Sequence, residues 1–410
     1  MEVTIERILP GGLGLAHAEG RTVMVGLAAP GDRVRVSIDR EKGNVAFASI
    51  DEVIEPSPQR VEPPCQYFGR CGGCDFQQMS YDAQLAAKVE IIKDCLHRIG
   101  RIENVPAFQI TPAPNPWHYR TRAQWQYDSI RQRLGYFESG SRNVCDVVEC
   151  AVLAPELQQT LTNLRERMQD GSPPDDARDF RAVAGDGGVS LAPDWGTSPT
   201  LRKGSGQRGT SPTVREGSDL PAQQVTRTIG GDTYRLNAES FFQANEDLLP
   251  KLIDLAIGGA VGEVAVDLYC GVGFFTLPLA RRFAKVIGVE GDSVAAAFAR
   301  ANLAKAGLAD GNIVARDVGQ WLDSDAWSSL NGAPVDFLLL DPPRTGAESR
   351  VIAGILSLKP KRISYVSCDP ATLARDLRKL IVGGYTLDSV AAFDMFPQTH
   401  HVETVVHLTG

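Results

Sequence analysis

The carboxy-terminal part of the sequence alternates short apolar runs with longer helix-like stretches. The apolar runs VAVDLY, KVIGVE, NIVA, VDFLLL and RISYVS lie between residues 264 and 367, and stretches such as SVAAAFARANLAKAG and ATLARDLRKLI separate or follow them. This rhythm predicts parallel strands joined by helices, which is a doubly wound α/β sheet. Ligands of such sheets bind at the carboxyl ends of the strands, so the residues just after each run are the first candidates for a site.

The first 58 residues have a different pattern. Short alternating runs, VTIERI, RTVMV, DRVRVSI and NVAFASI, are divided by the turn sequences PGGLG, APGD and EKGN. We expect five short strands and a small closed or partly open β-barrel. Such barrels often bind RNA, but this one has six basic and nine acidic residues, so a role in packing alone stays open.

The length and net charge of the chain limit which classes of protein it can belong to. A chain of 410 residues is too long for one ordinary core, and two or three domains are expected. Its 42 basic and 50 acidic residues give a formal charge of −8, so any nucleic-acid contact must be a local basic surface. Neither a membrane span nor a secretory signal is recognisable, and we expect a soluble, cytoplasmic protein.

The cysteines are unevenly distributed. They lie at positions 65, 71, 74, 95, 145, 150, 270 and 368. In a reducing compartment, a group such as Cys65, Cys71 and Cys74 indicates metal binding rather than disulfides. Cys150 supplies a fourth thiolate, and Cys145 is a close rival for that place. By spacing alone, zinc and a [4Fe-4S] cluster are both compatible with four cysteines.

Three stretches lie between the barrel and the α/β part. Apolar residues at positions 85, 89, 92, 96 and 99 predict a helix from about Ser80 to Arg98. Residues 117–142 combine five arginines with six aromatic residues, which fits either an RNA-contact surface or a twisted hairpin with half-buried aromatics. The composition of residues 170–222 predicts a mobile linker, interrupted by a possible hairpin in FRAVAGDGGVSLA.

The turn after the first α/β strand, DLYCGVGFF, suits a nucleoside ligand. Gly271 and Gly273 let the backbone approach a ligand closely, and Glu290 ends the next strand, where it can accept hydrogen bonds from ribose hydroxyls. A dinucleotide fingerprint needs a third glycine where this chain has Thr276. The pattern therefore favours a nucleoside without a pyrophosphate.

Two later turns carry reactive groups. VDFLLLDPPR ends a buried strand, and its two prolines fix a loop that carries Asp341 and Arg344. In YVSCDPATLARDL, Cys368 follows a strand, Asp369 is suited to the N-cap and Pro370 to the first helical position. We expect the helix terminus to favour the Cys368 thiolate, which would make it a reactive cysteine.

These motifs together carry a family resemblance. DxYCGxGxF, LDPPR, SCDPATxARD and FPQTxHVE closely resemble the uracil-C5 RNA methyltransferases that depend on S-adenosylmethionine. Within that family the chain is most similar to the iron–sulfur branch typified by the 23S ribosomal RNA uridine-5-methyltransferases. The resemblance implies a TRAM-type barrel at 1–58, a central iron–sulfur α+β domain at 59–235 and a Rossmann-like class I methyltransferase domain at 236–410. No family motif occurs between about 170 and 225.

The implied reaction explains why a cysteine is needed. C5 of uracil is a poor nucleophile, but a thiolate that adds to C6 makes C5 able to attack a methyl group. The resemblance implies that Cys368 is this nucleophile and that Glu403 is the base that removes the C5 proton. His400 and His401 are rival bases because an unperturbed histidine has a more convenient pKa. The uridine must be unstacked before C6 can be reached.

The resemblance also implies the binding sites. The expected cofactor-binding residues are Gln243, Tyr269, Phe274, Glu290, Asp317 and Asp341, of which Asp317 matches only by pattern. The expected ligands of a [4Fe-4S] cluster are Cys65, Cys71, Cys74 and Cys150, and this cluster is expected to tie the central domain together and shape an RNA surface. Arg344 contacts RNA or orders the catalytic loop, while Cys270 has no assigned chemistry.

The expected partner is an RNA, ribosomal rather than transfer RNA, with no DNA and no membrane, and the protein is expected to be a monomer. The same chemistry on transfer RNA is the first alternative. A metal-bound RNA-binding protein with a degenerate methyltransferase fold is the second, and loss of cofactor binding would support it. A nucleotide-dependent oxidoreductase is the third, and the missing third glycine counts against it.

Overall fold

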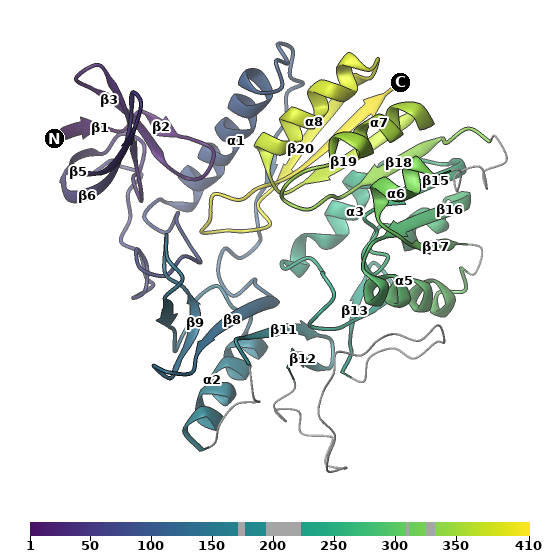
Figure 1. Ribbon diagram of the computed structural model, residues 1–410, viewed down its shortest axis with the longest axis horizontal. Coiled ribbons are helices and arrows are strands. Elements are labelled where there is room, and N and C mark those ends of the chain that lie inside the picture. Colours follow the sequence, from purple (N-terminus) through teal and green to yellow (C-terminus); the bar gives the residue numbers. More distant parts are fainter. Residues whose placement is uncertain (171–176, 194–222, 309–310, 325–332) are drawn as a thin grey trace.

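The computed structural model describes residues 1–170, 177–193, 223–308, 311–324 and 333–410 (Figure 1). The purple N-terminal strands lie at one end of the molecule, and the green and yellow α/β part lies at the other (Figure 1). The blue and teal central strands lie below them in this view (Figure 1). Across the described ranges, no helix is both long and apolar enough to cross a membrane.

The N-terminal part is a six-stranded sheet with the order β1-β5-β6-β4-β3-β2. Its strands are β1 (Glu2–Thr4), β2 (Arg7–Ile8), β3 (Gly14–Ala18), β4 (Arg21–Val25), β5 (Arg33–Lys42) and β6 (Val45–Glu55). Its buried side chains form a small core of their own. There is one strand more than the expected five, because the first apolar run divides at Ile5, whose N–H donates to the carbonyl of Asp32 over 2.9 Å.

The central part begins with the cysteine-rich segment and the predicted helix, α1 (Tyr81–Arg98), whose N-cap is Ser80. A five-stranded antiparallel sheet follows in the order β10-β9-β8-β11-β12. Its strands are β8 (Arg122–Asp128), β9 (Arg133–Phe137), β10 (Val144–Asp146), β11 (Asp179–Gly185) and β12 (Gly188–Ala192). Helix α2 (Pro155–Asp170) contributes leucines to the core of this sheet.

The structure decides two points that the sequence left open in the central part. Trp125 and Tyr127 are buried in the core of the β8–β9 hairpin, so the hairpin interpretation holds for these aromatics and they are not available to stack on bases. The possible hairpin in FRAVAGDGGVSLA is confirmed as strands β11 and β12, in which Phe180 and Ala182 are fully buried. The rest of the linker prediction, residues 171–176 and 194–222, falls outside the described residues.

The C-terminal part is built on a mixed sheet of eight strands in the order β17-β16-β15-β18-β19-β21-β20-β7. Strands β15 (Gly262–Leu268), β16 (Phe283–Glu290), β17 (Asn312–Ala315), β18 (Phe337–Leu340) and β19 (Arg362–Ser367) are parallel, as predicted. Strand β21 (Glu403–Thr409) runs antiparallel to β19 and to β20 (Thr386–Phe393). The edge strand β7 (Ile110–Thr111) comes from the central part, and the hairpin β13 (Val225–Ile229) to β14 (Asp232–Leu236) precedes the domain.

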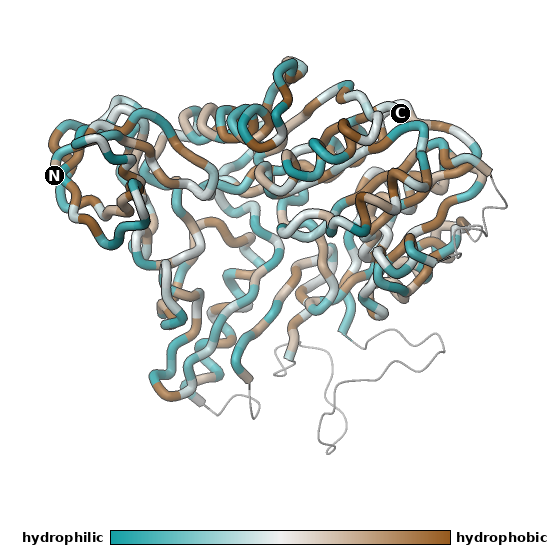
Figure 2. Tube along the Cα trace, turned by 45° about the horizontal axis from the view of Figure 1, so that its top comes forward, coloured by the Kyte–Doolittle hydropathy of each residue, from teal (hydrophilic) through white to brown (hydrophobic). Residues whose placement is uncertain are grey.

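Helices cover both faces of this sheet. One core contains α6 (Val318–Asp323), α7 (Ser349–Leu358) and α8 (Pro370–Val382), and the other contains α3 (Leu249–Ile257), α4 (Thr276–Ala280) and α5 (Ser293–Lys305). The short 3-10 helix η1 (Glu246–Leu248) leads into α3. Figure 2 shows the brown, apolar segments of this part gathered inside the layers. The central helix α1 shares the first core and contacts α8, so the central and C-terminal parts are packed as one layer there.

The buried face of α1 differs from the predicted one. Leu85 and Val89 are only half-buried, whereas Gln84 and Lys88 are buried on the face that turns toward the C-terminal part. A buried lysine or glutamine must be hydrogen-bonded, because an unpaired polar group in the interior is costly. The partners of Gln84 and Lys88 lie in the loop before β21, as described below.

Candidate active site and cysteine cluster

A cavity of about 700 Å³ opens at the carboxyl ends of the parallel strands, where the alternation of strands and helices predicts a site. Six of the eight predicted catalytic and cofactor-binding residues line it: Gln243, Tyr269, Glu290, Asp341, Cys368 and Glu403. Phe274 and Asp317 do not line it. The sequence therefore brings together most of the predicted site, although these residues are spread over 161 positions of the chain (403 − 243 + 1).

The glycine turn after β15 forms one wall of the cavity. Tyr269 has a φ of 62° and Gly271 a φ of 53°, so both lie in the left-handed region. This conformation is unusual for Tyr269, because it carries a side chain. The N–H of Gly271 donates to Glu290 Oε2 over 2.8 Å, and the N–H of Asp292 donates to Glu290 Oε1 over 2.7 Å. Burial nevertheless raises the pKa of Glu290.

Phe274, Asp317 and Cys270 lie near the cavity but do not line it. Phe274 is buried behind the cavity among the rings of Tyr234, Phe242 and Phe275. Asp317 caps α6 by accepting from the N–H of Gln320 over 2.9 Å, and it pairs with Arg350 at 3.0 Å. Cys270 is buried, and burial raises its pKa, so this thiol is inert in the free protein.

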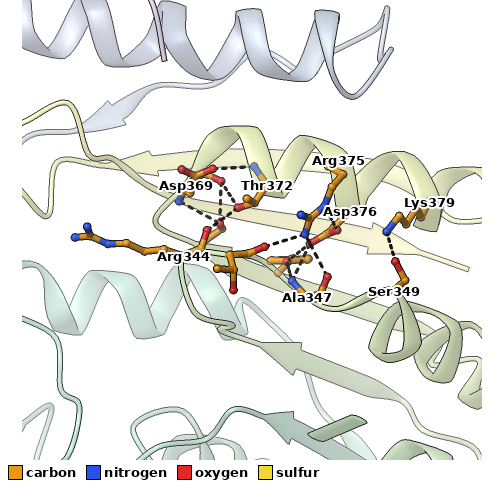
Figure 3. A network of polar contacts seen from close by, with 11 residues as sticks. Arg344, Ala347, Ser349, Asp369, Thr372, Arg375, Asp376 and Lys379 are labelled. Carbon is orange, nitrogen blue, oxygen red and sulfur yellow. Dashed lines mark hydrogen bonds and ion pairs between the residues drawn. The ribbon is translucent and has the colours of Figure 1, made fainter. Parts of the chain in front are cut away.

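The loop that carries Asp341 and Arg344 is fastened to helix α8 (Figure 3). Thr372 Oγ1 donates to the carbonyl of Arg344 over 3.2 Å, and Arg375 donates to the carbonyl of Thr345 over 3.0 Å. At the start of α7, Ser349 Oγ accepts from Lys379 of α8 over 3.0 Å. The two prolines fix the loop's start, and α8 fixes the rest of it.

The centre of this network is the fully buried carboxylate of Asp376 (Figure 3). It accepts from the N–H of Ala347 and from the hydroxyl of Tyr365, each over 2.9 Å, and it pairs with Arg375 at 2.9 Å. A buried carboxylate with several donors is well satisfied. Because α8 starts directly after Cys368, the same bonds fix the DPPR loop relative to the predicted nucleophile.

Cys368 lies between β19 and α8, half-buried at the cavity wall. The predicted helix start is confirmed, because Asp369 accepts from the N–H of Thr372 over 2.8 Å and Pro370 follows as the first helical residue. The expected thiolate form of Cys368 is not supported. Burial, followed by the nearby carboxylates of Glu403 and Asp341, raises the pKa of Cys368 to about 12. In the free protein these effects outweigh the helix terminus, and the thiol is protonated.

Glu403, which is buried, and Asp341, which is half-buried, carry neighbouring carboxyl groups beside Cys368. Burial raises the pKa of each, and the charge of Asp341 raises that of Glu403 further, while Arg344 opposes this. Gln243 Nε2 donates to Asp341 Oδ2 over 3.3 Å. Glu403 Oε1 is buried and has no hydrogen-bond partner within the described ranges. Such an orphaned oxygen in a cavity wall points to a missing ligand.

The two rival bases have different positions. His400 hydrogen-bonds to the carboxylate of Asp75 and does not line the cavity. His401 lines an adjacent groove, and burial, with the neighbouring cationic groups, lowers its pKa to about 2. An imidazole with so low a pKa is neutral in the physiological range and is a weak base.

The cavity lining also contains cationic residues, which the sequence predicted only in part. Arg120, Arg122, Arg181 and Arg344 line the cavity together with Phe241, whose ring is 61% exposed. Arg120 and Arg122 belong to the predicted arginine-rich stretch, but nothing in the pattern around Arg181 indicated a site. A groove of about 400 Å³ continues past Arg120 and Arg344 toward His401. The lining of the cavity thus contains both carboxyl and guanidinium groups.

The predicted cluster ligands Cys65, Cys71, Cys74 and Cys150 line one small cavity near Arg120. Cys145 does not line it, and its sulfur accepts from Arg70 Nε over 3.3 Å. Within the described residues, no group of three or more His, Cys, Asp or Glu side chains is arranged to hold a metal ion. Burial raises the pKa of Cys74 to about 12, so the bare thiol is protonated.

Comparison with known proteins decides the family. The sequence matches "tRNA (Uracil-5-)-methyltransferase" over residues 226–410 and "tRNA (uracil(54)-C(5))-methyltransferase, TRAM domain" over residues 1–59. A 23S rRNA (uracil(1939)-C(5))-methyltransferase RlmD of Alkalilimnicola ehrlichii is 33% identical over 429 residues, covering 98% of this chain and 95% of that protein. The chain belongs to the RNA (uracil-5-)-methyltransferase family.

Other relatives agree with this assignment. An RNA methyltransferase of Thermosynechococcus vestitus, tlr0942, which is named as uncharacterized, is 33% identical and covers 100% of this chain and 98% of its own. The crystal structure of the Pyrococcus abyssi tRNA (uracil-54, C5)-methyltransferase with S-adenosyl-L-homocysteine has a TM-score of 0.71 at 24% identity and full coverage of both chains. The predicted class I methyltransferase fold with an N-terminal TRAM domain is confirmed.

Proposed function

We propose that this methyltransferase transfers a methyl group from S-adenosylmethionine to C5 of a specific uridine in 23S ribosomal RNA. One observation carries the proposal: a cysteine, two neighbouring carboxyl groups and four arginines line the same cavity at the carboxyl ends of the sheet. A thiol and a base are the two groups that the chemistry at C5 demands. The arginines suit a phosphate-bearing substrate.

The cavity fits the proposed cofactor. S-adenosylmethionine supplies an electrophilic methyl group on a sulfonium cation. Glu290 accepts hydrogen bonds at the end of β16, where ribose hydroxyls of nucleosides bind in related sheets. Asp341 and Glu403 add negative charge that suits a cation, and Gly271 leaves room for a close approach of the backbone. Gln243 and Tyr269 complete the proposed contacts, while Phe274 and Asp317 remain predictions from the resemblance.

We infer the following roles for the catalytic residues. Cys368 Sγ adds to C6 of the uracil ring, which makes C5 nucleophilic toward the methyl group. After the methyl group has joined C5, Glu403 removes the C5 proton, and the bond between Sγ and C6 breaks to restore the ring. The cationic charge of the bound cofactor would lower the pKa of the Cys368 thiol, and that of the carboxyl pair, toward the working range.

Glu403 is preferred to the histidines as the base. Its unpaired Oε1 is buried in the cavity wall, and the raised pKa of a buried carboxyl suits a group that takes up a proton. His401 is a weaker base because of its lowered pKa, and His400 is engaged by Asp75. These observations support Glu403, rather than either histidine, as the proposed base.

The proposed RNA path runs along the arginines. The target uridine enters the cavity between Cys368 and the ring of Phe241, and its neighbours follow the groove lined by Arg120, Arg344 and Tyr136. Guanidinium groups can bind the phosphates along such a path while the base is turned out of its stack. The TRAM domain at the N-terminus is the second proposed RNA contact.

A [4Fe-4S] cluster held by Cys65, Cys71, Cys74 and Cys150 is part of the proposal. The four thiols share one cavity. A single zinc ion would draw four sulfurs to within about 4 Å of each other, since Zn–S bonds are about 2.3 Å long. A [4Fe-4S] cluster binds one cysteine at each of four irons, so its four cysteine sulfurs can lie farther apart than they would around one zinc ion. Its proposed role is to hold the central domain together.

Ribosomal RNA is preferred to transfer RNA because full-length relatives named for 23S rRNA exceed 30% identity, whereas the similar tRNA enzyme structure is 24% identical. The test is methylation of 23S rRNA and tRNA, each transcribed without modifications, with nucleoside mass spectrometry of the products. We expect 5-methyluridine at one site in the 23S rRNA. Methylation of tRNA alone would overturn the substrate, and no methylation of either RNA despite cofactor binding would overturn the proposed reaction. Loss of cofactor binding as well would favour a non-catalytic RNA-binding protein.

A further inference from the structure

The loop between β20 and β21 leads directly into Glu403, and residues far away in the sequence hold it. We call residues 394–402 the base loop. Lys88 pairs with Asp394 and donates to the carbonyl of Phe396 over 3.0 Å, and both charged side chains are fully buried. Tyr119 donates from its hydroxyl to the carbonyl of Pro397 over 3.0 Å. The central part thus fastens the first half of the loop.

Gln398 is the most constrained residue of the base loop. Its φ of 69° is unusual for a residue with a side chain, and such a conformation persists only where its surroundings enforce it. Gln84 makes two reciprocal hydrogen bonds of 3.0 Å with the side chain and the N–H of Gln398. The N–H groups of Asp75 and Phe76 both donate to its carbonyl, over 3.1 and 3.0 Å.

His400 is held by Asp75, the residue that follows Cys74. The N–H of His400 donates to Asp75 Oδ1 over 2.8 Å, and the imidazole Nδ1 bonds to Asp75 Oδ2. The cysteine-rich segment and the base loop are therefore joined by a two-point contact three residues before Glu403. Any movement of Asp75 would be passed to His400 and along the chain to the base.

The TRAM domain also contacts Asp75 and His400. Gly12, in the turn between β2 and β3, has a φ of 80°, and a Cβ at this position would lie 3.1 Å from both Asp75 Oδ2 and His400 Cβ. Such a distance is shorter than an ordinary van der Waals contact. Its neighbour Gly11 has a φ of 87°, but a Cβ there would meet nothing within 4 Å. The three parts of the chain meet at Gly12, Asp75 and His400.

We infer that the contact between Gly12, Asp75 and His400 is a positioning device, through which the TRAM domain and the cysteine-rich segment set the position of Glu403. Asp75 and His400 are positioning residues, because neither lines the cavity. The inference rests on the proposed role of Glu403. Misplacement of a catalytic group by about 1 Å can lower a rate by up to about a hundredfold, so a small displacement at His400 is enough to matter.

The test compares Gly12→Ala with Gly11→Ala in the full-length enzyme. Both variants force alanine into a left-handed conformation, but only Gly12→Ala presses on Asp75 and His400. We expect Gly12→Ala to lower kcat about tenfold relative to Gly11→Ala, which corresponds to about 1.4 kcal/mol. The Kd for S-adenosylhomocysteine should be the same in both, and amide hydrogen exchange of residues 394–402 should be faster only in Gly12→Ala.

A second pair of variants guards against loss of folding. Asp75→Asn keeps an acceptor for the N–H of His400, so it should retain more of kcat than Asp75→Ala at equal thermal stability. Equal kcat and equal exchange for Gly12→Ala and Gly11→Ala would overturn the inference, as would an Asp75→Ala effect confined to the Kd for S-adenosylhomocysteine. If the proposed chemistry itself is wrong, the wild type will form no covalent adduct with 5-fluorouridine RNA, and this result is distinct from a failure confined to the variants.

Discussion

The thiol of Cys368 should be unreactive in the free protein, against the usual expectation for a cysteine before a helix. The perturbation is alkylation by iodoacetamide, which reacts with the thiolate alone. Burial and the carboxyl groups of Glu403 and Asp341 keep the proton on the sulfur. Bound S-adenosylmethionine should reverse this, because a cation nearby favours the charged form of an acid.

The size of the slow alkylation in the free protein, and of its acceleration by the cofactor, follows from the pKa of Cys368. With a pKa of about 12, the thiolate fraction of Cys368 at pH 8 is about 10⁻⁴, against about a quarter for an ordinary thiol of pKa about 8.5. Alkylation should therefore be roughly a thousandfold slower than that of a free cysteine. An opposite charge within a few ångströms lowers the pKa of an acid by roughly 1 to 3 units, so the cofactor should raise the rate at least about tenfold.

The assay is site-resolved peptide mass spectrometry of Cys368 over time, with free glutathione as the reference thiol. S-adenosylhomocysteine is the matched control, because it occupies nearly the same space without the sulfonium charge. We expect faster alkylation with S-adenosylmethionine than with S-adenosylhomocysteine. Alkylation of the free protein at the rate of an ordinary thiol, or no difference between the two ligands, would refute the electrostatic argument.

Three further predictions concern stability and the cluster. Asp394→Asn leaves the buried ammonium of Lys88 without its partner and should lower the free energy of unfolding by about 3 to 5 kcal/mol in urea titration; a loss below about 1 kcal/mol would contradict the buried pair. The pKa of Glu403 is raised on folding, so its contribution to stability is complete below about pH 4.3 and is lost as the pH rises toward the folded pKa. Glu403→Gln should accordingly stabilise the cofactor-free protein more at pH 8 than at pH 5 in thermal unfolding, and a difference independent of pH would speak against the raised pKa. Cys74→Ser should remove the visible absorbance of the proposed cluster and weaken RNA binding while leaving the Kd for S-adenosylhomocysteine unchanged; an unchanged spectrum would exclude Cys74 as a ligand.

Local signals in the sequence predicted local structure well. The apolar spacing gave α1 its bounds within one residue, and the Asp-Pro pair marked the cap and start of α8. The alternation of strands and helices located the cavity, because the carboxyl ends of parallel strands share one edge of the sheet. Glu290 was placed at that edge by the pattern itself, and Glu403 by the family resemblance; both line the cavity.

What depended on contacts distant in sequence was missed. The apolar spacing of α1 did not indicate that the polar residues Gln84 and Lys88 are buried, because their partners lie more than 300 positions away. The protonation of Cys368 could not be predicted either, since the charges that oppose the thiolate come from two other strands. Arg181 lines the cavity only because β11 pairs with β8, a long-range register that no short pattern contains.

The central claim is that Cys368 forms a covalent bond to C6 of a uridine while its C5 is methylated. The most direct measurement is denaturing mass spectrometry of the wild type and Cys368→Ala after incubation with 5-fluorouridine-substituted 23S rRNA and S-adenosylmethionine. Because fluorine at C5 cannot leave as a proton, Glu403 cannot complete the reaction. The account predicts a stable adduct that contains one methyl group in the wild type and none in Cys368→Ala. An adduct that survives the substitution, or its absence in a wild type that methylates the same unsubstituted RNA, would contradict it.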